Sequence, residues 1–199
     1  MKRNFIGRLW GRSNVRNASA ISEAANGEKS SDGAADVIRS GPSEQPLKIW
    51  IMNHYATEMF FNHAGRHYWF AKKLEQRGFS PTVFTASSFH NRPESIDTNG
   101  KRYKIMYTGD TPFVFVKATP ASGNGIARIR NMLQFFFGLF PSARGYAATC
   151  GKPDIIIGSS VHPLTMVAGL LIARRMKVPC ICEIRDLWPE AIFSFGKTT

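Results

Sequence analysis

The sequence predicts an α/β fold in which a mostly parallel sheet lies between two layers of helices. Short, nearly continuous apolar runs occupy residues 47–53, 80–86, 154–158 and 178–184. Such runs are typical of parallel strands covered on both faces. Stretches with helical periodicity separate them, and right-handed helical crossovers make successive strands parallel. With 43% hydrophobic and 12% aromatic residues, the chain can also build a core of ordinary size.

The first strand–helix–strand unit spans residues 47–86. A loop over residues 56–65 leads from the first strand to a helix at about 66–76. Gly78 is a typical stop signal after such a helix, and the second strand follows at 80–86. The apolar side of the helix is expected to carry Tyr68, Trp69, Ala71 and Leu74.

An antiparallel hairpin is predicted over residues 102–118. Its sequence alternates in polarity and breaks at 108–111, where Gly109 follows Thr108. A helix should then run over 126–140 and end at Pro141, with a short second helix at 144–150. We expect the phenylalanines at 135–137 to belong to the core rather than to contact a membrane.

The last predicted unit comprises a strand at 154–158, a helix from Pro163 to about Met176, and a strand at 178–184. Proline suits the first turn of a helix, because its missing N–H has no partner there in any case. The final apolar run predicts a buried strand. Together these elements predict a Rossmann-like three-layer parallel sheet with an inserted antiparallel hairpin, within one domain over residues 47–199.

Residues 1–46 have a different composition and are predicted to form a disordered basic tail. They are rich in Ser, Asn, Gly and Ala and show no sustained period. Phe5, Ile6, Leu9 and Trp10 nevertheless recur at helical spacing beside arginines. That pattern leaves two alternatives open, a plain tail and a membrane-surface helix.

The charge balance favours an anionic partner without choosing its class. The chain has 26 Lys and Arg against 14 Asp and Glu, a net charge of +12. Nucleic acid, an anionic membrane and a phosphate-bearing substrate are all compatible with this charge. No apolar run reaches the length of a membrane span. The three cysteines have no zinc-ligand spacing and are expected to be small core residues in a reducing compartment.

Polar side chains follow the predicted strands at their carboxyl ends, where ligands bind in open α/β sheets. This edge should collect His54, Tyr55, Ser87, Ser88, His90, Ser159, Ser160, His162, Glu183, Arg185 and Asp186. Arg185 and Asp186 could equally form an ion pair that ties down a loop. No G-x-G-x-x-G motif follows the first strand, which argues against a dinucleotide site. No metal is predicted, because the chain has no D-x-D pair.

The same segments resemble the N-terminal half of a family 4 glycosyltransferase, a retaining enzyme of the GT-B class. The most specific segment is Glu183-Ile184-Arg185-Asp186-Leu187-Trp188-Pro189-Glu190. It is similar to a subgroup that transfers amino- or deoxy-sugars in capsule and lipopolysaccharide synthesis. Further matching segments are Asn53-His54-Tyr55, Gly65-Arg66-His67-Tyr68, Gly158-Ser159-Ser160-Val161-His162-Pro163 and residues 71–78 and 173–179.

The resemblance implies transfer of a sugar from a nucleotide-sugar to a lipid-linked or glycan acceptor, without an obligate metal or other cofactor. In that family the N-terminal domain holds the acceptor and a C-terminal domain holds the donor, so this chain is expected to be half of a GT-B fold without its donor domain. Arg185 and Asp186 are the expected catalytic residues. The expected substrate-binding residues are His54, Tyr55, Arg66, His90, Ser159, Ser160, His162 and Glu183.

A second hypothesis is a non-catalytic basic module that binds an anionic membrane or a protein. Nucleic acid is not an expected partner, because no recognition motif accompanies the charge. The expected location is cytoplasmic, with peripheral attachment to the inner face of the plasma membrane. The bases expected to contribute are Arg3, Arg8, Arg12, Lys72, Lys73, Arg174 and Arg175.

Overall fold

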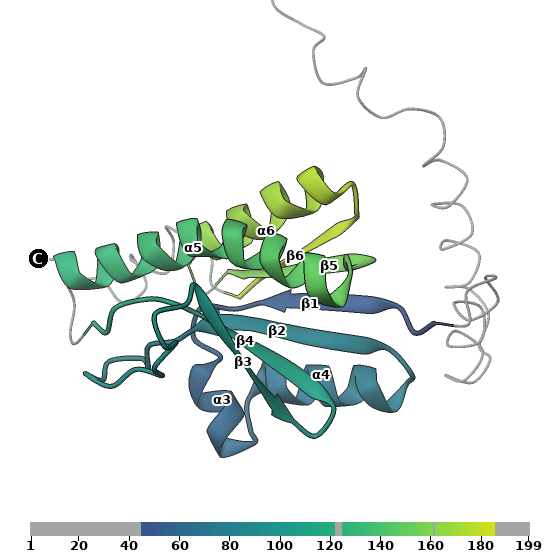
Figure 1. The fold of residues 1–199 in the computed structure, drawn as a ribbon, viewed down its shortest axis with the longest axis horizontal. Helices are drawn as coiled ribbons and strands as arrows, with labels where there is room; N and C mark the ends of the chain where they lie inside the picture. Colours follow the sequence, from purple (N-terminus) through teal and green to yellow (C-terminus); the bar gives the residue numbers. More distant parts are fainter. Residues whose placement is uncertain (1–44, 122–124, 161, 186–199) are drawn as a thin grey trace, which may run out of the picture. The chain divides into compact units, whose positions relative to one another are not determined.

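A computed structural model describes residues 45–121, 125–160 and 162–185 (Figure 1). The prediction of a disordered tail over 1–46 therefore falls almost wholly outside the described residues. The strands are β1 (Lys48–Met52), β2 (Ser80–Ala86), β3 (Tyr103–Thr108), β4 (Thr111–Val116), β5 (Ile155–Ser160) and β6 (Cys180–Ile184). The helices are α3 (Thr57–Asn62), α4 (Arg66–Gln76), α5 (Ile126–Cys150) and α6 (Pro163–Met176).

The strands form one six-stranded sheet in the order β3-β4-β2-β1-β5-β6. All neighbouring pairs are parallel except β3 and β4, which are antiparallel. β1 and β2 therefore lie at the centre, and the chain runs outward from β1 in both directions. The predicted Rossmann-like α/β sheet with an antiparallel pair is confirmed.

Helices cover both faces of the sheet, with α5 and α6 on one side and α3 and α4 on the other (Figure 1). Alternate residues of each strand serve the two cores. Trp50, Met52 and Phe84 pack toward α5 and α6, whereas Ile49, Ile51 and Val83 pack toward α3 and α4. Because helices cover both faces of the sheet, the sequences of its strands are nearly continuous apolar runs.

The hairpin lies where it was predicted, with β3 and β4 joined through Gly109 and Asp110. Gly109 has a φ of 60°, a left-handed conformation that glycine adopts without a Cβ clash. β4 also pairs with β2 in parallel. The hairpin therefore extends the sheet on the β2 side.

The prediction that Pro141 ends a helix is wrong, since α5 continues through it to Cys150. Proline removes one intrahelical hydrogen bond, the one that its N–H would have donated to the carbonyl of Phe137. Phe137 is on the exposed side of α5, where water can replace that bond. The three phenylalanines also divide: Phe135 is buried, Phe136 is partly buried and Phe137 is exposed.

Two details around α4 differ from the sequence prediction. The loop over 56–65 contains the short helix α3, and Trp69 projects into solvent while Tyr68 and Ala71 are buried. The buried face of α4 is narrow, because it covers only one flank of the sheet. An aromatic residue next to that face can therefore remain exposed.

The last strand is not buried, which corrects the prediction for 178–184. β6 is an edge strand that pairs only with β5 among the described strands. Ile181 and Ile184 are more than half exposed, and Cys182 is also exposed. The expectation that the cysteines are core residues therefore fails for Cys182, while Cys150 and Cys180 are half-buried.

No helix in the described part of the chain combines the length and apolarity needed to cross a bilayer.

Candidate functional site

The site lies where the strand order reverses, between the carboxyl ends of β1 and β5. The chain leaves β1 toward α3 and α4 on one face, and leaves β5 toward α6 on the other. Such a divergence opens a crevice in doubly wound sheets. His54 follows β1 and His162 follows β5, so the topology brings two distant histidines to the same place.

The two histidines contact each other directly. Nδ1 of His54 lies 2.6 Å from Nε2 of His162, and both side chains are buried. The His54 ring is stacked between Tyr55, at 4.4 Å between ring centroids, and Phe135, at 4.5 Å. In a hydrogen bond between two imidazoles one nitrogen donates and the other accepts, so the two rings cannot both be protonated while this contact is kept.

Two further polar groups surround this pair. His90 packs edge-on against Tyr55 at 4.4 Å between ring centroids. Arg128, in the first turn of α5, places its guanidinium 5.8 Å from the centre of the Tyr55 ring. The group draws its residues from four separate segments, the loops after β1, β2 and β5 and the first turn of α5. We call His54, Tyr55, His90, Arg128 and His162 the histidine cluster.

The environment of the histidine cluster keeps its imidazoles uncharged. Burial, and then the charge of His162, hold the pKa of His54 well below its usual value. Burial, followed by Arg128, lowers the pKa of His162 to about 4. The same two causes lower the pKa of His90, with Glu58 acting weakly in the opposite direction. At neutral pH the cluster therefore offers neutral imidazoles beside one guanidinium.

A second group of polar residues is built around His67, near the start of α4. Nδ2 of Asn53 lies 2.7 Å from Nδ1 of His67, and Nε2 of His67 lies 2.8 Å from Oε2 of Glu183. An amide NH₂ only donates, so Nδ1 of His67 is the acceptor. Nε2 of His67 therefore carries the proton and donates a hydrogen bond to Glu183. The Tyr55 backbone N–H donates to Oδ1 of Asn53 at 3.1 Å, which fixes the amide orientation.

Glu183 is held in its ionised form by this group. Arg66 donates to its Oε1 at 2.8 Å. Burial raises the pKa of Glu183, but the nearby Ser159 hydroxyl and the hydrogen bonds from His67 and Arg66 outweigh it and leave the pKa below its usual value. Burial also lowers the pKa of His67, partly offset by Glu183. We call Asn53, Arg66, His67 and Glu183 the His67 group.

The predicted site residues thus fall into two clusters and a remainder. His54, Tyr55, His90 and His162 meet in the histidine cluster, and Arg66, Ser159 and Glu183 meet in or beside the His67 group. Ser160 accepts a hydrogen bond at 3.0 Å from the backbone N–H of Arg185, whose side chain is exposed. Asp186 lies outside the described residues, so its predicted role is untested.

Four residues of the site were not among the predicted site residues: Asn53, His67, Arg128 and Asn131. Asn131 donates to Ser88 and to the carbonyl of Thr119, and it opposes the lowering of the pKa of His54. Position beyond a strand could have identified Asn53, since it directly follows β1. Arg128 and Asn131 lie on a helix, and only the packing of α5 brings them to this edge.

Among the described residues, no group of three His, Cys, Asp or Glu side chains is placed to hold a metal ion. No protein-family model matches the chain, and no curated protein matches it significantly. One matching solved structure is the C-terminal domain of a hydrogenase from Pyrococcus furiosus. It is 16% identical, with a TM-score of 0.45, over 72% of this chain and 95% of that chain. So distant a likeness adds nothing to the functional argument.

Proposed function

We propose that this chain is the acceptor-side domain of a retaining glycosyltransferase. The observation that carries the proposal is the histidine cluster at the switch point of the sheet. Its half-buried members Tyr55 and His90 can exchange hydrogen bonds with hydroxyl groups, and Arg128 supplies a positive charge beside them. A sugar acceptor presents hydroxyls, and an acceptor linked to a lipid through phosphate also presents negative charge. The resemblance of residues 47–195 to family 4 supports the same assignment.

In this proposal the cluster positions the acceptor, and a second domain supplies the nucleotide-sugar. Transfer requires donor and acceptor atoms to approach within about 3–3.5 Å in a site that excludes water. Arg185 and Asp186 remain proposed catalytic residues, and Glu183 is a proposed acceptor-binding carboxylate. Peripheral attachment to a membrane would bring a lipid-linked acceptor to this edge of the sheet.

The test is a transfer assay with mass-verified product. We expect transfer when the chain is combined with a domain that binds the nucleotide-sugar. His162→Asn should then lower the rate by about tenfold or more, as expected for loss of a positioning contact. Trp69→Ala, at an exposed position of α4 that belongs to neither cluster, is the control. No transfer by any such combination would contradict the proposed function.

A further inference from the structure

The outward face of α5 carries an apolar stripe that no described residue covers. Ile126, Ile129, Leu133 and Phe137 are 86%, 57%, 40% and 64% exposed. At 100° per residue these four positions fall within an arc of about 80° on the helix. A helix that only covers a sheet places such residues inward. The spacing therefore gives α5 two apolar faces, one on the core and one toward solvent.

Basic residues flank this stripe, with little opposing charge. A hollow of about 840 Å³ adjoins the first half of α5, and one of about 910 Å³ adjoins the second half. The residues that line the two hollows include a single carboxylate, that of Asp97. Their cations are Arg102, Lys117, Arg130, Arg144, Lys152 and Arg175. α5 itself contains no acidic residue.

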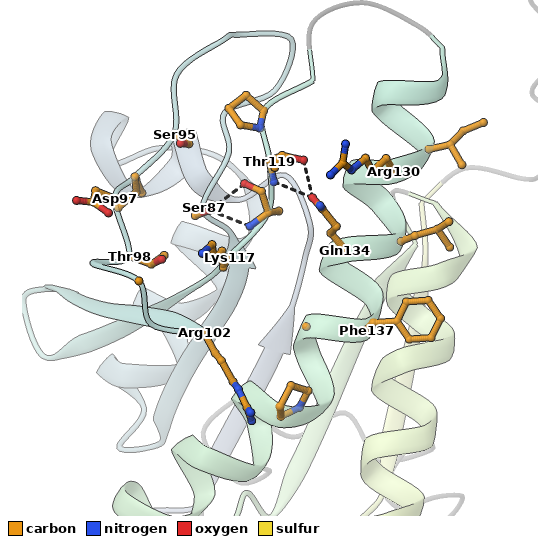
Figure 2. Close-up of a pocket in the computed structure, with 18 of the residues that line it drawn as sticks. Ser87, Ser95, Asp97, Thr98, Arg102, Lys117, Thr119, Arg130, Gln134 and Phe137 are labelled. Carbon is orange, nitrogen blue, oxygen red and sulfur yellow. Dashed lines mark hydrogen bonds between the residues drawn. The ribbon is translucent and has the colours of Figure 1, made fainter.

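Figure 2 shows how these groups are arranged around the first hollow. α5 borders it on one side, and the segment with Ser95, Asp97 and Thr98 borders it on the other. The Phe137 ring projects from α5 on the side away from that segment. The four apolar side chains of the stripe themselves line this hollow together with its bases, so exposed apolar groups and cations share one surface.

We propose that the outward face of α5 docks on an anionic lipid bilayer. The partner must accept apolar side chains along a helix about 37 Å long. It must also carry negative charge that complements the bases lining both hollows. An anionic bilayer offers both, since its acyl region accepts aliphatic and aromatic side chains while its headgroups attract Lys and Arg. Long basic side chains reach headgroups while their stems lie along apolar surface.

This surface differs from the one that the sequence predicted. Lys72, on α4, donates hydrogen bonds to Glu75 and to the carbonyl of Thr108, and Lys73 donates one to Gln76. Both lie on the helix layer opposite α5. Arg175 is shared by the two predictions, since it lines the second hollow and stacks on Phe140 at 4.9 Å. Docking of α5 adds a defined surface to the peripheral attachment proposed above, but it does not depend on sugar transfer.

The experiment is co-sedimentation of the full chain with phosphatidylcholine vesicles, with and without phosphatidylglycerol, at low and high salt. The chain should bind the anionic vesicles and release them at high salt. Arg130→Gln with Arg144→Gln should weaken binding about 25-fold, at about fivefold per cation. Ile129→Asp with Phe137→Asp should weaken binding by at least about tenfold. All four side chains are exposed or partly so, and circular dichroism melts confirm that each variant folds.

Two controls separate α5 from other surfaces. Trp69→Asp changes an exposed aromatic residue on α4, and its vesicle binding should stay within about twofold of that of the unmodified chain. The second control replaces three N-terminal bases, Arg3, Arg8 and Arg12, by Gln. The proposal fails if the α5 variants bind like the unmodified chain, if neutral vesicles bind equally well, or if only the N-terminal variant loses binding. It also fails if the chain binds no vesicle and the α5 variants lose binding to a protein instead.

Discussion

His162 is a buried base whose ionisation the fold opposes. Its pKa falls from 6.5 to about 4 on folding. Between these two pH values the unfolded chain binds a proton that the folded chain does not, so folding stability is lost as the pH falls through this window. The lowered pKa values of His54, His67 and His90 act in the same direction.

We therefore expect the free energy of unfolding to decrease steadily from pH 7 to pH 4. His162 alone contributes at most about 3 kcal/mol to that decrease. Urea unfolding of the chain and of His162→Asn across this range provides the measurement. The variant should be less stable at pH 7, because His54 loses its partner, but it should show a shallower dependence on pH. Parallel curves for the two proteins would contradict the assignment.

The His67 group gives a prediction about a single proton. Asn53 donates to Nδ1 of His67, which leaves this nitrogen unprotonated. Asn53→Asp replaces the donor by a carboxylate, which favours a proton on Nδ1 while Glu183 holds the one on Nε2. The pKa of His67 should therefore rise, as measured by NMR titration of its ring protons. Glu183→Gln is the opposite control and should lower it, so a fall in Asn53→Asp would count against the proposed hydrogen-bond direction.

At the residue scale, sequence reasoning found side chains that directly follow strands. His54, His90 and His162 follow β1, β2 and β5, and Glu183 lies near the end of β6; the parallel strands bring them to one edge as predicted. It did not find Arg128, whose position depends on where α5 begins and how it packs. Nor could it divide the edge residues into two clusters, because that division depends on hydrogen bonds between side chains.

Among the elements, β5 and α6 approach unusually closely through two glycines. A Cβ on Gly158 would lie 3.2 Å from Cα of Met166, and one on Gly169 would lie 3.2 Å from Cα of Gly158. Neither backbone can move without shifting the whole helix. Close approach of α6 also fixes His162, which immediately precedes its first residue.

Gly158→Ala and Gly169→Ala should each destabilise the fold by about 1–3 kcal/mol, the usual cost of overpacking. The double variant should cost less than the sum, because one displacement of α6 relieves both clashes. Thermal or urea unfolding of the three variants tests this. Full additivity would show that the two glycines do not share a contact.

The edge position of β6 can be tested through its cysteines. Cys182 is exposed, whereas burial and then the neighbouring Cys182 raise the pKa of Cys180 to about 11. Alkylation requires the thiolate, so iodoacetamide at mildly alkaline pH should modify Cys182 well before Cys180. Peptide mapping by mass spectrometry gives the order. Equal rates, or faster reaction at Cys180, would contradict the described orientation of β6.

Element type was predictable where the apolar period was long, and less so where tertiary packing decides. The strands and α4 appear at the predicted places. The sequence could not show that Pro141 lies inside α5, because a proline on a solvent-facing turn costs only one hydrogen bond there. The sequence could not show that β6 is an edge strand, since similar apolar runs occur in central and in exposed strands.

For the whole molecule, strand–helix alternation was sufficient to predict the doubly wound sheet and its hairpin. The order of strands was not predicted, and it is this order that places β1 next to β5. Ile49 pairs with Ile155 across more than a hundred residues of sequence. The side chain of Asp154 also accepts the backbone N–H of Lys48, at 2.8 Å, at the start of the same pairing.

This long-range pairing has a consequence for how the chain folds. β1, β2 and the hairpin of β3 and β4 are joined by comparatively short segments. The segment between β1 and β5 is much longer, and bringing its two ends together is entropically costly. We expect β2 and β4 to gain protection in pulsed hydrogen-exchange experiments before β5 does. The contact between His54 and His162 would then form only when β5 docks. Nascent or kinetically trapped chains could hold most of their secondary structure and still lack a formed site.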